Sequence, residues 1–284
     1  MLASSLRRGL IVASLCLPLA GPAQAARSEF DVRTEGLERA QAAMVGVISE
    51  AVEDAGSIDT LGPVRVGSGV VIGDDGLVLT IGYLILEAER VDLIVDGERR
   101  VPARVVAYDQ ATGFGLLQAL TPLKLTPVPI GRSAGVSPDE PLMVASGMPD
   151  GGLSLARLVS QRAFSGYWEY HIDSALFTVP PRSDHSGAGL FNLDGELLGI
   201  GSLVVGDALG PGAGRLPGNM FVPVDLLKPV IAEMRARGAS RSSTRAWLGL
   251  NCEERDGEIR VMRVTRDGPA ELAGVQPGDR ILRI

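Results

Sequence analysis

The sequence predicts an all-β domain over residues 44–205. This part of the chain consists of short runs rich in valine, leucine and isoleucine, and Asp-Gly pairs separate several neighbouring runs. Asp-Gly between apolar runs is the strongest short-range signal for a β-hairpin, because both residues tolerate the positive φ angles of a tight turn. The composition, 45% hydrophobic and 21% charged, is that of a folded globular protein.

Three hairpins are expected in chain order, each made of two apolar runs around an Asp-Gly turn. The paired runs are 69–72 with 77–80, 91–95 with 101–106, and 189–192 with 197–200. Residues 34–53 fit a short helix running into a strand, and periodicity alone does not separate the two.

A helix is expected at 224–237, after a loop rich in proline and glycine. Asp225 is a suitable N-cap, and Gly238 is a suitable stop. The small polar residues that follow have linker composition, and a new apolar pattern begins at Trp247.

The N-terminus has the pattern of a signal peptide. Arg7 and Arg8 precede an apolar run over 10–20, which is short for a membrane span, and Ala-Gln-Ala at 23–25 is a cleavage site. The mature chain is therefore expected to begin near Ala26, in the periplasm or outside the cell. An uncleaved membrane anchor is the alternative.

Cleavage would leave Cys252 as the one cysteine, so neither an internal disulfide nor a cysteine zinc site is expected. We expect Cys252 to be packed rather than reactive. The net charge of −7 argues against a nucleic-acid surface, and no metal or cofactor is expected. The expected organisation is a signal peptide (1–25), an N-terminal segment (26–43), a main domain (44–237), a linker (238–245) and a second module (246–284).

The segment Asp-His-Ser-Gly-Ala-Gly-Leu-Phe-Asn at 184–192 resembles the nucleophile loop of a trypsin-fold serine protease, with Ser186 at the nucleophile position. Further motifs in the same order are similar to the HtrA/DegP-type family. They lie at 67–72 with 75–80, 186–196, 220–225, and 246–250 with 268–282. The resemblance implies two six-stranded β-barrels with the active site between them, followed here by a partial PDZ-like module.

Two partners of the serine are replaced by residues that do not support the chemistry. The base histidine of the family corresponds to Tyr83, and the orienting aspartate corresponds to Gly113. A tyrosine hydroxyl titrates near pH 10, so Tyr83 is a poor base at neutral pH. Loss of the triad base costs on the order of a million-fold in turnover, and loss of the orienting acid about ten-thousand-fold or more.

The oxyanion region is also altered, because Asp184 stands where the family has a glycine. A carboxylate beside a developing oxyanion is unfavourable. Substitute bases are few. His185 is expected to face away from the cleft, and His171, beside Asp173, is expected on a surface loop or strand end.

The second module resembles the start of a PDZ domain. The stretch Trp247, Leu248, Gly249 and Leu250 is similar to the loop that captures a peptide C-terminal carboxylate through backbone N–H groups. The sequence stops after about half of such a domain, and weak peptide binding is expected of this half alone.

The sequence therefore predicts an exported HtrA-like pseudoprotease that binds polypeptide segments or C-termini in a scaffolding or regulatory role. One alternative is an active serine endopeptidase of periplasmic protein quality control that uses His171 or His185 as its base. Another is a peptide-binding adaptor that acts through its PDZ domain. Membrane association after cleavage is not expected, and the resemblance is compatible with a homo-oligomer.

Overall fold

The structure is a computed structural model that describes residues 29–138, 140–165, 171–244 and 246–283. The predicted signal peptide at 1–25 lies outside the described residues. Within them, no helix is both long enough and apolar enough to cross a membrane.

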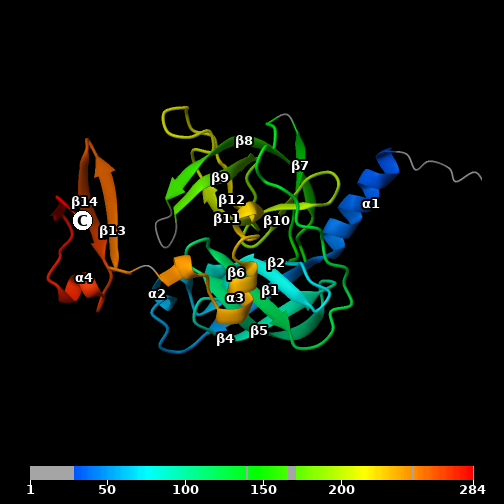
Figure 1. The fold of residues 1–284 in the computed structure, drawn as a ribbon, viewed down its shortest axis with the longest axis horizontal. Helices are drawn as coiled ribbons and strands as arrows, with labels where there is room; N and C mark the ends of the chain where they lie inside the picture. Colours follow the sequence, from blue (N-terminus) through cyan, green and yellow to red (C-terminus); the bar gives the residue numbers. More distant parts are fainter. Residues whose placement is uncertain (1–28, 139, 166–170, 245, 284) are drawn as a thin grey trace, which may run out of the picture.

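The first barrel closes in the order β1-β2-β3-β6-β5-β4 (Figure 1). Its strands are β1 (Met44–Ala51), β2 (Val64–Val71), β3 (Leu77–Ile81), β4 (Ala88–Val95), β5 (Arg99–Asp109) and β6 (Phe114–Ala119). All neighbouring pairs with a described register are antiparallel, and the two predicted hairpins in this region are β2–β3 and β4–β5.

The second barrel closes in the order β10-β11-β12-β9-β8-β7. Its strands are β7 (Pro141–Ala145), β8 (Leu153–Ser165), β9 (His171–Val179), β10 (Gly189–Phe191), β11 (Leu197–Val205) and β12 (Gly218–Pro223). The third predicted hairpin is β10–β11. The all-β prediction and the double six-stranded barrel are both confirmed.

The helical segments lie outside the barrels, and all of them except α1 have seven residues or fewer. They are α1 (Glu29–Ala42), α2 (Ile58–Leu61), η1 (Gly82–Leu84), η2 (Val224–Leu226), α3 (Ile231–Arg237) and η3 (Arg241–Thr244). The single helix predicted at 224–237 is divided into η2 and α3. Asp225 does not cap α3, because its carboxylate accepts hydrogen bonds from the Ala134 N–H and the Lys228 ammonium instead. Gly238, at φ 85°, ends α3 as predicted.

A C-terminal sheet follows the barrels, with the order β13-β14-β15 and a PDZ-like arrangement. It contains β13 (Leu250–Arg255), β14 (Glu258–Val264) and β15 (Arg280–Ile281), with α4 (Pro269–Leu272) between the last two strands. Cys252 lies on β13 and is exposed. The expectation of a packed cysteine is therefore wrong, because β13 is an edge strand of a thin sheet.

The two barrels meet along a tightly packed seam. Ser68 of β2 lies 3.1 Å from Ser146 (Oγ to Oγ) and accepts a 3.0 Å hydrogen bond from the Gly147 N–H. A Cβ at Gly147 would come within 2.2 Å of the Val45 backbone, so only glycine allows this approach. The seam fixes one barrel against the other, and the Ser186 loop lies beside it.

Candidate functional site

Ser186 is held between the barrels by hydrogen bonds of its own backbone and that of its neighbour. The Ser68 N–H of the first barrel donates to the Ser186 carbonyl at 2.8 Å, and the Gly187 N–H donates to the Gly201 carbonyl of β11 at 2.9 Å. Gly187 has φ +74°, and a Cβ there would lie 1.9 Å from the Ser68 carbonyl oxygen. Glycine after the serine is therefore required by the backbone, as its place in the motif suggests.

The residues before Ser186 are fixed by a buried asparagine. Asn219 of β12 accepts from the Arg182 N–H at 2.7 Å and donates to the Arg182 carbonyl at 3.0 Å. Both peptide groups of Arg182 are thus satisfied by one side chain, which is 1% exposed. The start of the nucleophile loop is therefore hydrogen-bonded to β12.

Asp184 is paired with a cation, which the sequence analysis did not anticipate. The Arg182 guanidinium donates to its two carboxylate oxygens at 2.8 and 2.5 Å, and to the Ser154 hydroxyl at 2.6 Å. Burial disfavours the charged carboxylate. The hydrogen bond and charge of Arg182, with a hydrogen bond from Ser146, outweigh it and hold the pKa of Asp184 below its ordinary value. The expected repulsion of an oxyanion is therefore partly offset by the guanidinium.

Tyr83 lies on η1, and contacts with other residues of the first barrel fix the position of this turn. The Gly82 N–H donates to the Gly113 carbonyl at 2.7 Å, and the buried Arg65 guanidinium donates to the Tyr83 carbonyl at 3.1 Å. The ring of Tyr108 packs so closely on Gly82 that a Cβ there would meet it at 2.2 Å. The position of Tyr83 is therefore determined by the surrounding packing.

The Tyr83 hydroxyl bridges the barrels at the serine. Its oxygen lies 2.8 Å from the Ser186 Oγ and 2.8 Å from the Ser202 carbonyl oxygen of β11. The phenol has one hydrogen, and a carbonyl oxygen can only accept. Both contacts are satisfied when Tyr83 donates to Ser202 and the Ser186 hydroxyl donates to Tyr83. A neutral phenol oxygen that already donates its proton accepts a hydrogen bond but does not remove the serine proton.

Gly113, the residue predicted to replace the orienting acid, has no side chain. Gly113 has φ +79°, and its N–H donates to the Asp109 carbonyl at 2.8 Å. Asp109 is the acid that remains nearby. Its carboxylate is fully buried and accepts from the hydroxyl of Thr112 and from Ser240 and Ser243 of the linker. The Asp109 carboxylate therefore holds the linker, and none of its described hydrogen bonds reaches Ser186.

Neither histidine has a described contact with Ser186. The His185 Nδ1 lies 3.2 and 3.1 Å from the carbonyl oxygens of Arg182 and Ser183, so this nitrogen carries a hydrogen and donates. Burial lowers the pKa of His185, despite opposing hydrogen bonds to backbone carbonyls. The ring is therefore held through Nδ1 by its own loop, and a hydrogen bond to the Ser202 backbone of β11 also acts on it.

His171 is exposed at the start of β9, where it pairs with two nearby residues. The Ser165 hydroxyl lies 2.8 Å from Nδ1, and the Asp173 carboxylate lies 3.1 Å from Nε2. The sequence analysis expected this surface position and the Asp173 neighbour. It missed Ser165, which the β8–β9 register places opposite His171.

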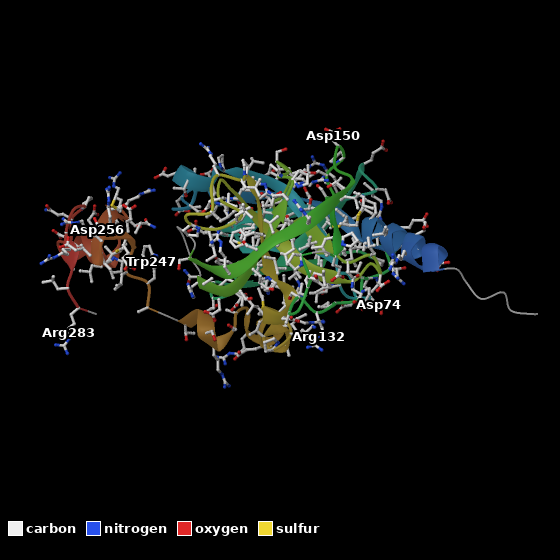
Figure 2. The ribbon with its side chains drawn as sticks, turned by 90° about the horizontal axis from the view of Figure 1, so that it is seen from above. Asp74, Arg132, Asp150, Trp247, Asp256 and Arg283 are labelled. Carbon is white, nitrogen blue, oxygen red and sulfur yellow. The ribbon has the colours of Figure 1, made fainter. Side chains whose placement is uncertain are left out.

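The predicted peptide-binding loop lies at the start of the C-terminal sheet. Trp247, labelled in Figure 2, and Leu248 are each 52% exposed. The Leu248 carbonyl accepts from the Ala270 N–H, and the Gly249 carbonyl accepts from the Thr265 N–H. Backbone hydrogen bonds within the C-terminal module therefore fix the predicted peptide-binding loop. Among the described residues no group of three or more histidine, cysteine or acidic side chains is arranged to hold a metal ion.

Replacing Tyr83 with phenylalanine is expected to lower the free energy of unfolding by about 1–2 kcal/mol, because the Ser202 carbonyl and the Ser186 hydroxyl lose a partner between the barrels. Ser186→Ala is the matched control and should cost less, since Tyr83 keeps its bond to Ser202. Urea denaturation of the three proteins measures the difference. A Tyr83→Phe protein as stable as the parent would show that the bridge has no structural value.

The comparisons with known proteins agree with this geometry. A family model described as a trypsin-like peptidase domain matches residues 67–200. A probable periplasmic serine endoprotease DegP-like of Marinomonas sp. is 29% identical over 76% of the chain and 47% of that protein. The mitochondrial serine protease HTRA2 of Bos taurus is 25% identical over 96% of the chain and 63% of that protein. The chain thus spans about half the length of the DegP-like relatives it matches.

Solved structures show the same fold. The HtrA-type protease AlgW with a tripeptide superposes with a TM-score of 0.60 at 20% identity, covering 88% of this chain and 82% of that one. The same protease with a decapeptide gives a TM-score of 0.57 at 19% identity, covering 88% and 85%. In sequence and in fold the chain is therefore similar to HtrA-type, trypsin-fold serine proteases.

Proposed function

We propose that this HtrA-like protein binds polypeptide segments in the cleft between its barrels without hydrolysing them efficiently. The observation that carries the proposal is the contact of the Ser186 hydroxyl with a tyrosine that donates to the Ser202 carbonyl. The serine has a hydrogen-bond partner there, but that partner is not a base.

The expected loss of rate is large. Removing the base alone lowers turnover by on the order of a million-fold in a comparable serine protease, and the residual rate comes from the oxyanion hole and substrate binding. Here Gly113 also removes the orienting acid. An active enzyme that uses His185 or His171 instead is disfavoured, because both rings are committed to other partners.

Binding is supported by the preserved scaffold around the serine. Asn219 brackets Arg182, and the first barrel still hydrogen-bonds the Ser186 carbonyl. These hydrogen bonds hold the loop at the cleft in a defined arrangement. Two structural neighbours are HtrA-type proteases with a bound tripeptide and decapeptide, which favours a polypeptide as the ligand here as well. Because the DegP-like relatives are named periplasmic, we place this function in the periplasm.

The test is a cleavage assay with an unfolded substrate and a serine label. The mature protein should leave casein intact and should not react with a fluorophosphonate probe, whereas binding of fluorescent casein should be detectable by anisotropy. An active DegP-type protease is the positive control, and Ser186→Ala is the matched variant. Cleavage or labelling that disappears in Ser186→Ala would overturn the inactive assignment.

A further inference from the structure

Three polar side chains form a continuous chain of hydrogen bonds on β8 and β9 of the second barrel. The Ser165 hydroxyl lies 2.8 Å from Nδ1 of His171, and the Asp173 carboxylate lies 3.1 Å from Nε2 of the same ring. A serine nucleophile requires this order of serine, imidazole and carboxylate, with the imidazole in the middle. The structure thus gives His171 a different serine from the one that the sequence analysis considers for it.

The strand register places the three side chains on one face. Ser165 lies directly opposite His171 in the β8–β9 pairing. His171 and Asp173 are two residues apart on β9, so their side chains point the same way. Ile172, between them, points to the other side and is 1% exposed, and Phe164 on β8 also packs against the core. Packing of these neighbours therefore holds the backbone at Ser165 and His171.

The chemistry of the three groups sets where their hydrogens lie. The Asp173 carboxylate only accepts, so Nε2 of His171 carries the ring hydrogen and donates it. Nδ1 then accepts the hydrogen of the Ser165 hydroxyl. In this arrangement His171 is a base for a serine, and Asp173 stabilises the imidazolium that forms when the proton moves. The Ser186 hydroxyl, in contrast, meets the Tyr83 hydroxyl and no described imidazole.

We propose that Ser165 is a second nucleophilic site of this protein, which His171 activates for acyl transfer from activated esters such as aryl acetates. The Ser165 oxygen attacks the ester carbonyl carbon while its proton passes to Nδ1 of His171. The bond from this carbon to the aryloxy oxygen then breaks, and the aryloxy group takes the proton from Nδ1, which leaves acetyl-Ser165 and a free phenol. Asp173 acts through the ring and is a positioning residue. None of these residues belongs to the site at Ser186, so the reaction does not depend on the proposed function.

Exposure limits this chemistry to esters with a good leaving group. The side chains of His171 and Asp173 are 51% and 96% exposed. Water therefore weakens the attraction between them, and it solvates the developing oxyanion in place of fixed donors. General-base assistance, about a hundredfold or more in a closed site, should fall to about tenfold here. Fluorophosphonates make a stronger demand for oxyanion donors, so the fluorophosphonate assay still reports on Ser186.

The experiment treats the protein with p-nitrophenyl acetate near neutral pH and locates the acetyl groups over time by fragment-ion mass spectrometry. Ser165 should be acetylated about tenfold faster than Ser174, an exposed serine on β9. His171→Ala should lower the Ser165 rate to that of Ser174 and leave the Ser174 rate unchanged. Asp173→Asn should lower the Ser165 rate by about threefold, and Asp173→Glu, which keeps the carboxylate, should restore most of it.

Asp150→Asn is the matched control, since Asp150 lies on an exposed loop between β7 and β8. It should behave like the parent. Circular dichroism melts check that each variant folds, and His171→Gln carries the test if His171→Ala does not fold. Equal acetylation rates at Ser165 and Ser174 in the parent would overturn the proposal. A Ser165 rate that is unchanged when His171 is replaced would also overturn it, because the serine would then react without a base.

Discussion

The double variant Tyr83→His/Gly113→Asp is expected to remain without detectable proteolysis, at least about ten-thousand-fold below an active DegP-type enzyme. The two substitutions restore the residue types of the triad but not the backbone that presents them. Gly113 has φ +79°, well beyond the φ of 53°, 55° and 57° at Asp96, Asp256 and Asp267, and its carbonyl accepts a hydrogen bond from the Gly82 N–H next to position 83. A carboxylate at position 113 would thus start from the wrong backbone conformation.

The loop around Gly113 cannot easily relax to correct this. Asp109, four residues earlier, is fixed by Thr112 and by the linker residues Ser240 and Ser243. Changing φ at Gly113 would disturb these bonds. Asp184 is expected to add a second obstacle, since the sequence predicts its carboxylate beside the oxyanion, even though Arg182 pairs with it.

Casein cleavage and fluorophosphonate labelling measure the outcome. Tyr83→His alone and Tyr83→His/Gly113→Asp/Ser186→Ala are the controls for the missing acid and for contaminating proteases. Recovery to within about tenfold of a DegP-type enzyme, lost in the triple variant, would show that the backbone at Gly113 adapts and that side-chain identity alone silences the site.

The barrels could be predicted because their signals are local. Each Asp-Gly turn joins two adjacent strands, and β10–β11 needs no information beyond residues 189–200. The motif order predicts that Tyr83 and Gly113 replace the base and the orienting acid, and this stays a prediction. The proximity of Tyr83 to Ser186 follows from the family arrangement, and the structure adds the Ser202 carbonyl, which decides the direction of the hydrogen bonds.

The missed features depend on contacts between residues far apart in the chain or on conformations that composition does not encode. Asn219 brackets Arg182 from 37 residues away, and nothing in either residue's neighbourhood indicates the pairing. Arg182 and Asp184 are close in sequence, but composition alone does not show that both side chains point to the same side and pair. Cys252 was expected to be packed because cysteines usually are, and the edge position of β13 overrides that tendency.

Asp109→Ala is expected to lower the free energy of unfolding by about 3–5 kcal/mol. This is the largest effect that we expect from replacing a single acidic side chain. The Asp109 side chain is fully buried. Its carboxylate accepts from the Thr112 hydroxyl at 2.6 Å, from the Ser240 N–H at 2.9 Å and from the Ser243 hydroxyl at 2.5 Å. Alanine would leave these donors buried without an acceptor. It would also remove two of the hydrogen bonds that join the linker to the first barrel.

The stability that the Asp109 carboxylate contributes should decrease as the pH is lowered. Burial opposes ionisation of Asp109, but hydrogen bonds from Ser240, Ser243 and Thr112 outweigh it and lower the pKa of the carboxyl. A group whose pKa is lower in the folded state stabilises the fold above its unfolded value of about 3.9, and this stabilisation disappears as the pH falls through the folded value. The stability gap between the parent and Asp109→Asn should therefore be constant near neutral pH and should shrink below about pH 4.

Urea denaturation at pH 7 and at several values below pH 4 measures both effects. Asp150→Ala is the control, since Asp150 lies on an exposed loop (Figure 2) and should change stability by less than about 0.5 kcal/mol. Asp109→Asn presents an NH₂ group to donors that need an acceptor, so it should not rescue the parent stability at neutral pH. A gap that stays constant into acid would mean that Asp109 acts through packing alone. The linker would then be held by Ala111, whose N–H donates to the Ser243 hydroxyl, and the buried charge would have no part in fixing it.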